Sequence, residues 1–197
     1  SGAPYTITPL FGDSNYVITI TDGNGCSTVI DTFMWQPTQI TYDVLIPDTN
    51  GFQISCFGAG DGEITFTNVN GGNIPYQYSI DAGATVGPLS SFVNLTENTY
   101  NLRVVDNLNC FTDTVVQLNS PGLFSLNPSV TSNYNGADVS CFGYTNGSIL
   151  VTSTNGVNNV SYEFNSSGIF STTDNWSNLG GGNYVINAKD DNGCTAT

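Results

Sequence analysis

The sequence predicts an all-β protein made of tandem immunoglobulin-like β-sandwich repeats of about 84 residues each. Cys26, Cys110 and Cys194 are equally spaced, and the tetrapeptide SCFG begins at residue 55 and again at residue 140. Self-similarity at a constant period indicates a repeat protein. Short apolar stretches bounded by Asn, Gly and Asp recur without any helical periodicity, which is typical of a β-sandwich.

The period divides the chain into three parts. We expect residues 1–36 to form the C-terminal half of a first repeat, and residues 37–120 to form a complete repeat. Residues 121–197 then form a third repeat that is truncated just after its last cysteine. Pro37 and Pro121, separated by the same interval as the cysteines, follow the last strand of a repeat and mark the joints between repeats. We expect the chain to be a piece of a longer polypeptide.

A β-hairpin recurs in every repeat. The stretch NYVITITDGNGC at 15–26 returns in related form at 99–110 and 183–194. Its apolar and polar residues alternate, as in a strand with one buried face, and a polar turn leads from it into a Thr- and Val-rich strand. Tyr100 and Tyr184 have the spacing of a tyrosine corner, in which the hydroxyl bonds back to the preceding turn. The alternative for both is a plain core tyrosine.

The hairpin turns carry an acidic residue in each repeat. Asp22, Asp106 and Asp190 begin these turns, and oxygen ligands two residues apart would suit Ca²⁺. Aspartate also stabilises turns by accepting hydrogen bonds from its own backbone. The second repeat breaks the ligand spacing, because Leu108 stands where Asn24 stands in the first. Turn formation is therefore favoured, no cofactor is expected, and calcium is the alternative.

Composition excludes several classes of function. The chain has two basic and sixteen acidic residues and a net charge of −14, which argues against nucleic acid or an anionic membrane surface as a partner. No apolar stretch is long enough for membrane insertion. The sequence contains no histidine, which excludes Ser-His and Cys-His relays. The acidic pair Asp61 and Glu63 becomes Asn146 and Ser148 in the third repeat, so we expect no enzyme.

Five cysteines without histidine or a CxxC motif predict disulfides, and hence an oxidising compartment. Pairing within repeats joins Cys56 to Cys110 and Cys141 to Cys194, and leaves Cys26 for a cysteine upstream. Pairing across repeats joins Cys26 to Cys56 and Cys110 to Cys141. Each scheme leaves one cysteine over, but the proline joints favour pairing within repeats. Such a crosslink would stabilise the fold by about 4 kcal/mol. It requires the SCFG segment to lie alongside the last strand, because the hairpin turn is at the opposite end of a simple sandwich.

Trp35 is an aromatic residue without a counterpart in the next repeat, where Asn119 takes its place. It lies beside Met34, two residues before Pro37 at the joint. We expect its side chain to form an apolar plug between repeats, and the alternative is a platform on which a ligand stacks.

These ordered motifs resemble a known family. The run SCFGAGDGEITFTNVNGGNIPYQYS, followed by YNLRVVDNLNC, resembles the SprB-type repeat of giant cell-surface adhesins in gliding bacteria, and so do VSCFGYTNGSILV and NYVINAKDDNGC in the third repeat. The third repeat departs from the pattern at 156–162, where GVNNVSY replaces the usual GG-x-x-PY. The family has no catalytic residues to carry over to this chain.

The resemblance implies an exported cell-surface protein, delivered by the type IX secretion system and associated with the outer membrane. Its expected role is an extended filament for surface adhesion and gliding motility. The expected partners are neighbouring repeats, the substratum or a polysaccharide surface, and the outer-membrane motility or secretion machinery. The alternatives are a polysaccharide-binding module and a generic spacer of another secreted protein.

Overall fold

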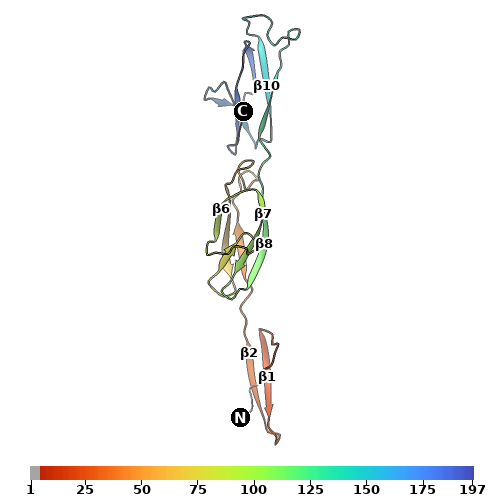
Figure 1. The fold of residues 1–197 in the computed structure, drawn as a ribbon, viewed down its shortest axis with the longest axis vertical. Helices are drawn as coiled ribbons and strands as arrows, with labels where there is room; N and C mark the ends of the chain where they lie inside the picture. Colours follow the sequence, from red (N-terminus) through yellow and green to blue (C-terminus); the bar gives the residue numbers. More distant parts are fainter. Residues whose placement is uncertain (1–4) are drawn as a thin grey trace.

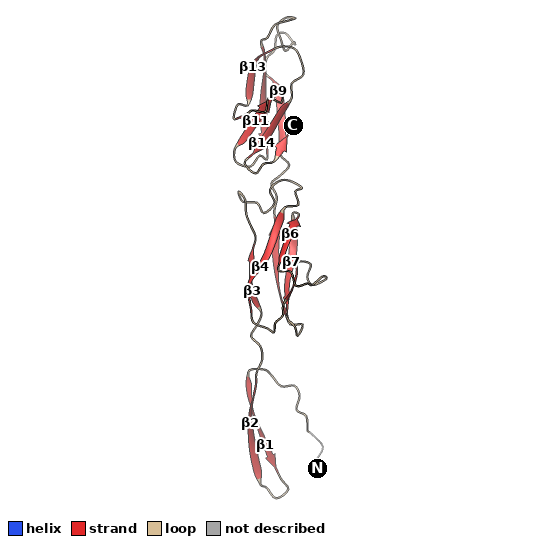
Figure 2. Cartoon of the chain, turned by 90° about the vertical axis from the view of Figure 1, so that its left-hand side faces the viewer, coloured by secondary structure: helices blue, strands red, loops and turns tan. Residues whose placement is uncertain are grey.

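The computed structural model describes residues 5–197, and within this range every helix or strand assigned is a β-strand. The chain forms three units that follow one another along one long axis, with the N-terminal hairpin at one end (Figure 1; Figure 2). The all-β prediction is confirmed. In the described part of the chain there is no helix with the length and apolar character needed to cross a membrane.

The first unit is a two-stranded hairpin. Strands β1 (Ser14–Thr21) and β2 (Ser27–Met34) pair antiparallel from Ser14↔Met34 to Thr21↔Ser27. Every residue of β2 is exposed, because no second sheet among the described residues covers the hairpin.

The second unit is a sandwich of two three-stranded sheets. One sheet has the order β3–β4–β6 and the other β5–β7–β8. This corresponds to strands A, B and E facing C, F and G of an immunoglobulin sandwich. The strands are β3 (Thr41–Leu45), β4 (Gly62–Asn70), β5 (Gln77–Ser79), β6 (Ser91–Leu95), β7 (Asn98–Val105) and β8 (Phe111–Leu118).

The core of this sandwich lies between the two sheets. Ile64 from β4, Leu102 from β7 and Leu118 from β8 are fully buried, together with Ile54 from the loop before β4. Burial of an aliphatic side chain of this size contributes about 1.5–3 kcal/mol. The ring of Phe66 adds contacts with surrounding aromatic rings at centroid distances of 5.2 to 6.1 Å, namely those of Tyr42, Tyr78 and Phe92.

The third unit repeats this architecture with the sheets β9–β10–β13 and β12–β11–β14–β15. Its last strand pairs with β14 through only two residues, Thr195 and Ala196. Phe164 stacks on Trp176 and Tyr184 in its core. The strands are β9 (Ser125–Val130), β10 (Gly147–Thr154), β11 (Val160–Phe164), β12 (Phe170–Ser171), β13 (Asn175–Leu179), β14 (Ile186–Asp190) and β15 (Thr195–Ala196).

Tyrosine corners are present in both sandwiches, which confirms that interpretation of the spacing. The Tyr100 hydroxyl donates a hydrogen bond to the Thr96 carbonyl at 2.9 Å, and the Tyr184 hydroxyl donates to the Gly180 carbonyl at 2.8 Å. Each bond ties the strand that follows to the turn before it. The β7 and β14 strands are therefore anchored in the same way in the two repeats.

The turn-forming role of the three aspartates is also confirmed. In each hairpin one carboxylate oxygen accepts the backbone N–H two residues on and that of the cysteine four residues on, at 2.8 to 3.0 Å. The other oxygen of Asp106 accepts the Asn73 N–H, and that of Asp190 accepts the Val157 N–H, both at 2.9 Å. Each aspartate of the sandwiches therefore fixes its hairpin turn to the loop beside it.

We predict that Asp190→Ala lowers the free energy of unfolding of the third repeat. It leaves the N–H groups of Val157 and Cys194 without their acceptor in a buried setting, which costs about 1–3 kcal/mol per unsatisfied group. Chemical denaturation followed by fluorescence of Trp176 measures the change. Asp22→Ala is the matched control, because its turn is exposed and should leave this transition unchanged. Equal effects of the two substitutions would contradict the prediction.

We also predict that stability falls in acid below about pH 4. Hydrogen bonds from Ser79 and from Thr85 lower the pKa of Asp81 from 3.8 to about 2. Because the folded pKa lies below the unfolded one, this stabilisation is complete above pH 3.8 and is lost as the pH falls towards 2. Melting temperatures measured from pH 6 to pH 2 should therefore decline mainly below pH 4. The decline should be shallower in Asp81→Asn, and an unchanged slope in that variant would refute the assignment to Asp81.

Candidate functional site: the joint between the second and third repeats

The joint begins at the end of β8, where the segment that precedes SCFG lies beside it. The backbone N–H groups of Gln53 and Ile54 both donate to the Asn119 carbonyl at 3.1 Å. In return, the Asn119 N–H donates to the Gln53 side-chain carbonyl at 3.1 Å. These bonds place the SCFG segment at the end of the second sandwich that faces the third.

A disulfide crosses the joint. Cys56 of the second repeat is bonded to Cys194 of the third, with the two Cα atoms 5.6 Å apart and a sequence separation of 138. The Asp190 carboxylate holds the Cys194 N–H at 2.9 Å and so positions this cysteine at the near end of the third sandwich. The two repeats are therefore connected covalently at two places, through the backbone and through the crosslink.

The predicted pairs Cys56–Cys110 and Cys141–Cys194 are wrong. Cys110 directly precedes β8, whereas Cys56 closely follows Gln53 and Ile54, which bond to Asn119 at the other end of that strand. Eight extended residues span about 27 Å, and a disulfide needs Cα atoms within about 7 Å. The eight residues of β10 separate Cys141 from Cys194 in the same way. The cross-repeat alternative of Cys26 with Cys56 is also not formed, and within residues 5–197 Cys26, Cys110 and Cys141 are free.

Polar side chains form further hydrogen bonds between the two repeats, beside the disulfide. Asn192 in the hairpin turn of the third repeat donates from Nδ2 to the Ser55 carbonyl at 3.1 Å. Its Oδ1 accepts a hydrogen bond from Nδ2 of Asn50 at 2.6 Å. Phe57 and Cys56 of the second repeat, with Leu123 and Phe124 of the third, line a hollow of about 240 Å³ beside the disulfide. The joint is thus a contact between the SCFG segment of one repeat and the hairpin turn of the next.

Hydrogen bonds and packing also fix the backbone segment that connects the second repeat to the third. Pro121 is buried, and the Ser120 hydroxyl donates to Oε2 of Glu97 at 2.6 Å. Nδ2 of Asn155 donates to the Leu123 carbonyl at 3.0 Å. A Cβ atom on Gly122 would lie 2.9 Å from the Asn155 side chain, so this position has no room for one unless Asn155 moves. The linker therefore packs against the third repeat.

Asp61 supports the SCFG segment, a role that sequence reasoning missed. Its Oδ1 accepts the Ser55 N–H at 3.1 Å, and hydrogen bonds from Ser55 lower the pKa of its carboxyl group. Asn146 does the same in the third repeat, where its Oδ1 accepts the Ser140 N–H at 3.1 Å. The two side chains occupy equivalent positions and differ in charge. The signal in the sequence was a hydrogen-bond acceptor at the same place after both SCFG motifs.

The remaining predicted positions lie at the first joint. Pro37 lines a hollow together with Cys110. Trp35 is 70% exposed, and its role as a plug between repeats stays a prediction. Among residues 5–197 no cluster of three or more His, Cys, Asp or Glu side chains could hold a metal ion. The calcium alternative at Asp22, Asp106 and Asp190 stays untested.

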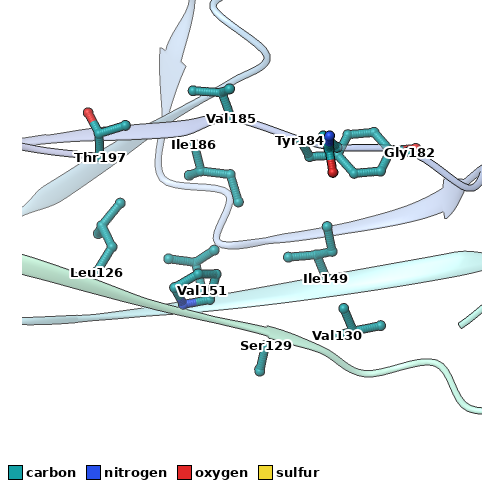
Figure 3. A pocket seen from close by; sticks show the side chains of 12 residues that line it. Leu126, Ser129, Val130, Ile149, Val151, Gly182, Tyr184, Val185, Ile186 and Thr197 are labelled. Atoms are coloured by element: carbon teal, nitrogen blue, oxygen red, sulfur yellow. The ribbon is translucent and has the colours of Figure 1, made fainter.

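A hollow of about 460 Å³ lies between the sheets of the third repeat. Figure 3 shows Tyr184, Val185 and Ile186 on one side of it and Ile149 and Val151 on the other. The equivalents of residues 184–186 are residues 100–102 of β7, which pair with Thr114 to Val116 of β8. The hollow therefore borders the edge that the last strand covers in the second repeat, and we assign it no ligand.

Comparison with known proteins gives a family match for part of the second repeat. Residues 53–85, which include the SCFG segment and β4, match the family model described as SprB repeat. A search of curated proteins found no match to the chain. The SprB repeat is a structural repeat family and not an enzyme family, and together with the disulfide it indicates an extracellular or surface protein. Residues 53–85 therefore match an SprB-type repeat, which indicates a cell-surface adhesin-type repeat region.

Proposed function

We propose that this chain is a non-catalytic segment of a giant adhesin, in which crosslinked sandwiches form an extended filament for surface adhesion and gliding motility. The observation that carries this proposal is the joint between two sandwiches that lie end to end (Figure 1). There a disulfide forms a second covalent connection in addition to the backbone. A flexible tether would need neither the crosslink nor the polar contacts of Asn192. A filament that transmits tension benefits from both.

The filament would reach outward from the cell surface. Its net charge of −14 favours solubility and mutual repulsion between neighbouring filaments over collapse onto an anionic surface. Export by the type IX system, association with the outer membrane and transport by the motility machinery belong to this proposal. The substratum or a surface polysaccharide would be the partner that the whole adhesin grips.

Tension applied to the two ends of the chain tests the mechanical role. With the disulfide intact, force passes directly from Cys56 to Cys194, so that the intervening residues cannot extend. Reduction should add the length of 138 residues, roughly 450–500 Å, to the fully unfolded contour. Single-molecule pulling with and without reductant measures this difference. Cys56→Ser should show the long contour in both conditions, and an equal contour for the wild-type chain in both would contradict the proposal.

A glycan array separates the filament from the polysaccharide-binding alternative. We expect no saturable binding by this fragment, because the hollow of about 460 Å³ in the third repeat borders an edge that a strand covers in the second repeat and is not lined by a ring of polar groups. Saturable binding to one class of glycan would replace the filament proposal with direct recognition. Ile149→Asp, which changes the lining of that hollow, would then show whether binding occurs there.

A further inference from the structure

The two halves of the joint between the second and third repeats each have an unpaired counterpart elsewhere among residues 5–197. Cys110 precedes β8 at the position that Cys194 occupies in the third repeat. Cys141 lies in the SCFG motif at the position of Cys56. Both thiols are exposed. We propose that Cys110 lies in a docking seat for the SCFG segment of another repeat, and that the segment around Cys141 is the matching ligand for such a seat.

Three residues beside the cysteine occupy equivalent positions in the two seats. Around Cys194 the seat is formed by Leu123, Phe124 and Thr195, and it receives Cys56 and Phe57. The equivalent residues around Cys110 are Gln39, Ile40 and Phe111, and all three line a hollow of about 320 Å³. The same aspartate-capped turn presents both cysteines, because the Cys110 N–H donates to Asp106 as the Cys194 N–H does to Asp190.

The phenylalanine of the SCFG motif is less exposed where the motif contacts a neighbouring repeat. Phe57 lies at the formed joint and is 58% exposed, whereas its equivalent Phe142 is fully exposed. Burial of this exposed ring in an apolar hollow would lower the free energy, because it removes apolar surface from water. The occupant of the seat is therefore an SCFG segment, which brings both the cysteine and the aromatic ring.

The seat at Cys110 is more apolar than the one at Cys194. Leu108 stands where Asn192 contacts Asn50 and Ser55 across the formed joint. Its side chain is 62% exposed, at a position whose equivalent faces the neighbouring repeat. Docking at Cys110 therefore exchanges two hydrogen bonds for an apolar contact.

Bond formation at the seat needs an external disulfide as oxidant. A disulfide reagent R–S–S–R reacts with the Cys141-type thiolate to give a mixed disulfide, and one R–S⁻ leaves. The Cys110 thiolate then attacks the SCFG sulfur, the new S–S bond forms, and the second R–S⁻ leaves. Two cysteine thiols are oxidised, one disulfide is reduced to two thiolates, and the two protons of the cysteines pass to the buffer or to the leaving thiolates, according to the pKa of the leaving thiol.

The test uses a synthetic peptide, ADVSCFGYTN, identical to residues 137–146 and activated at its cysteine as the 5-thio-2-nitrobenzoate mixed disulfide. One protein variant keeps only Cys110 free (Cys26→Ser, Cys141→Ser), and another keeps only Cys26 free (Cys110→Ser, Cys141→Ser). Cys26 is the matched control. It follows the same turn, but among residues 5–197 no counterpart of Gln39 and Ile40 lies beside it.

We expect the peptide to react with Cys110 at least tenfold faster than with Cys26, after each rate is divided by that for plain 5,5′-dithiobis(2-nitrobenzoate). Replacement of the phenylalanine of the peptide by alanine should remove the preference, while Leu108→Asp should reduce it. Equal normalised rates at Cys110 and Cys26, or a preference that survives the loss of phenylalanine, would overturn the proposal. The measurement concerns the joint alone, so its failure leaves the adhesive role of the filament untouched.

Discussion

The distance between the two ends of β8 is the constraint on which the rest of this structure depends. The strand is eight residues long, and it places Cys110 at one end of the second sandwich and the SCFG segment at the other. The two cysteines of a repeat therefore face opposite neighbours. A crosslink from either one leads out of the sandwich, so the disulfide stabilises the joint and leaves each core to support its own repeat. That core is small, and its stability comes from a few fully buried aliphatic residues.

The aspartate-capped turn links the fold to the joint. The carboxylate of Asp190 accepts three backbone N–H groups, from Val157, Asn192 and Cys194. One of these belongs to the loop beside the hairpin, one to the residue that contacts the second repeat, and one to the crosslinked cysteine. The same group therefore orients the hairpin turn, the neighbouring loop and the crosslink together. A calcium ion is not needed to explain why aspartate stands at this position.

Local patterns predicted much of the fold because they arise from short-range physics. Alternation marked β1, β7 and β14, and spacing alone predicted the tyrosine corners at Tyr100 and Tyr184. The disulfide was mispredicted, because the proline joints were given more weight than the end of the sandwich at which each cysteine lies. The pair Cys56 and Cys194 joins residues of different repeats, with the SCFG cysteine belonging to the earlier one. The length of the last strand was the available signal, since it excludes any pair within a repeat.

Crosslinks of this kind at successive joints would give an array an unusual response to tension. Force that crosses from an SCFG cysteine to the next hairpin cysteine returns to the backbone at the start of a last strand. It then follows that strand, the linker and the next first strand to another SCFG motif, as from Cys110 to Cys141. That segment can extend to roughly 100–110 Å at most. Much of this path is already extended, because it contains β8 and β9. The rest of each sandwich lies outside the load path, so unfolding it would lengthen the filament little.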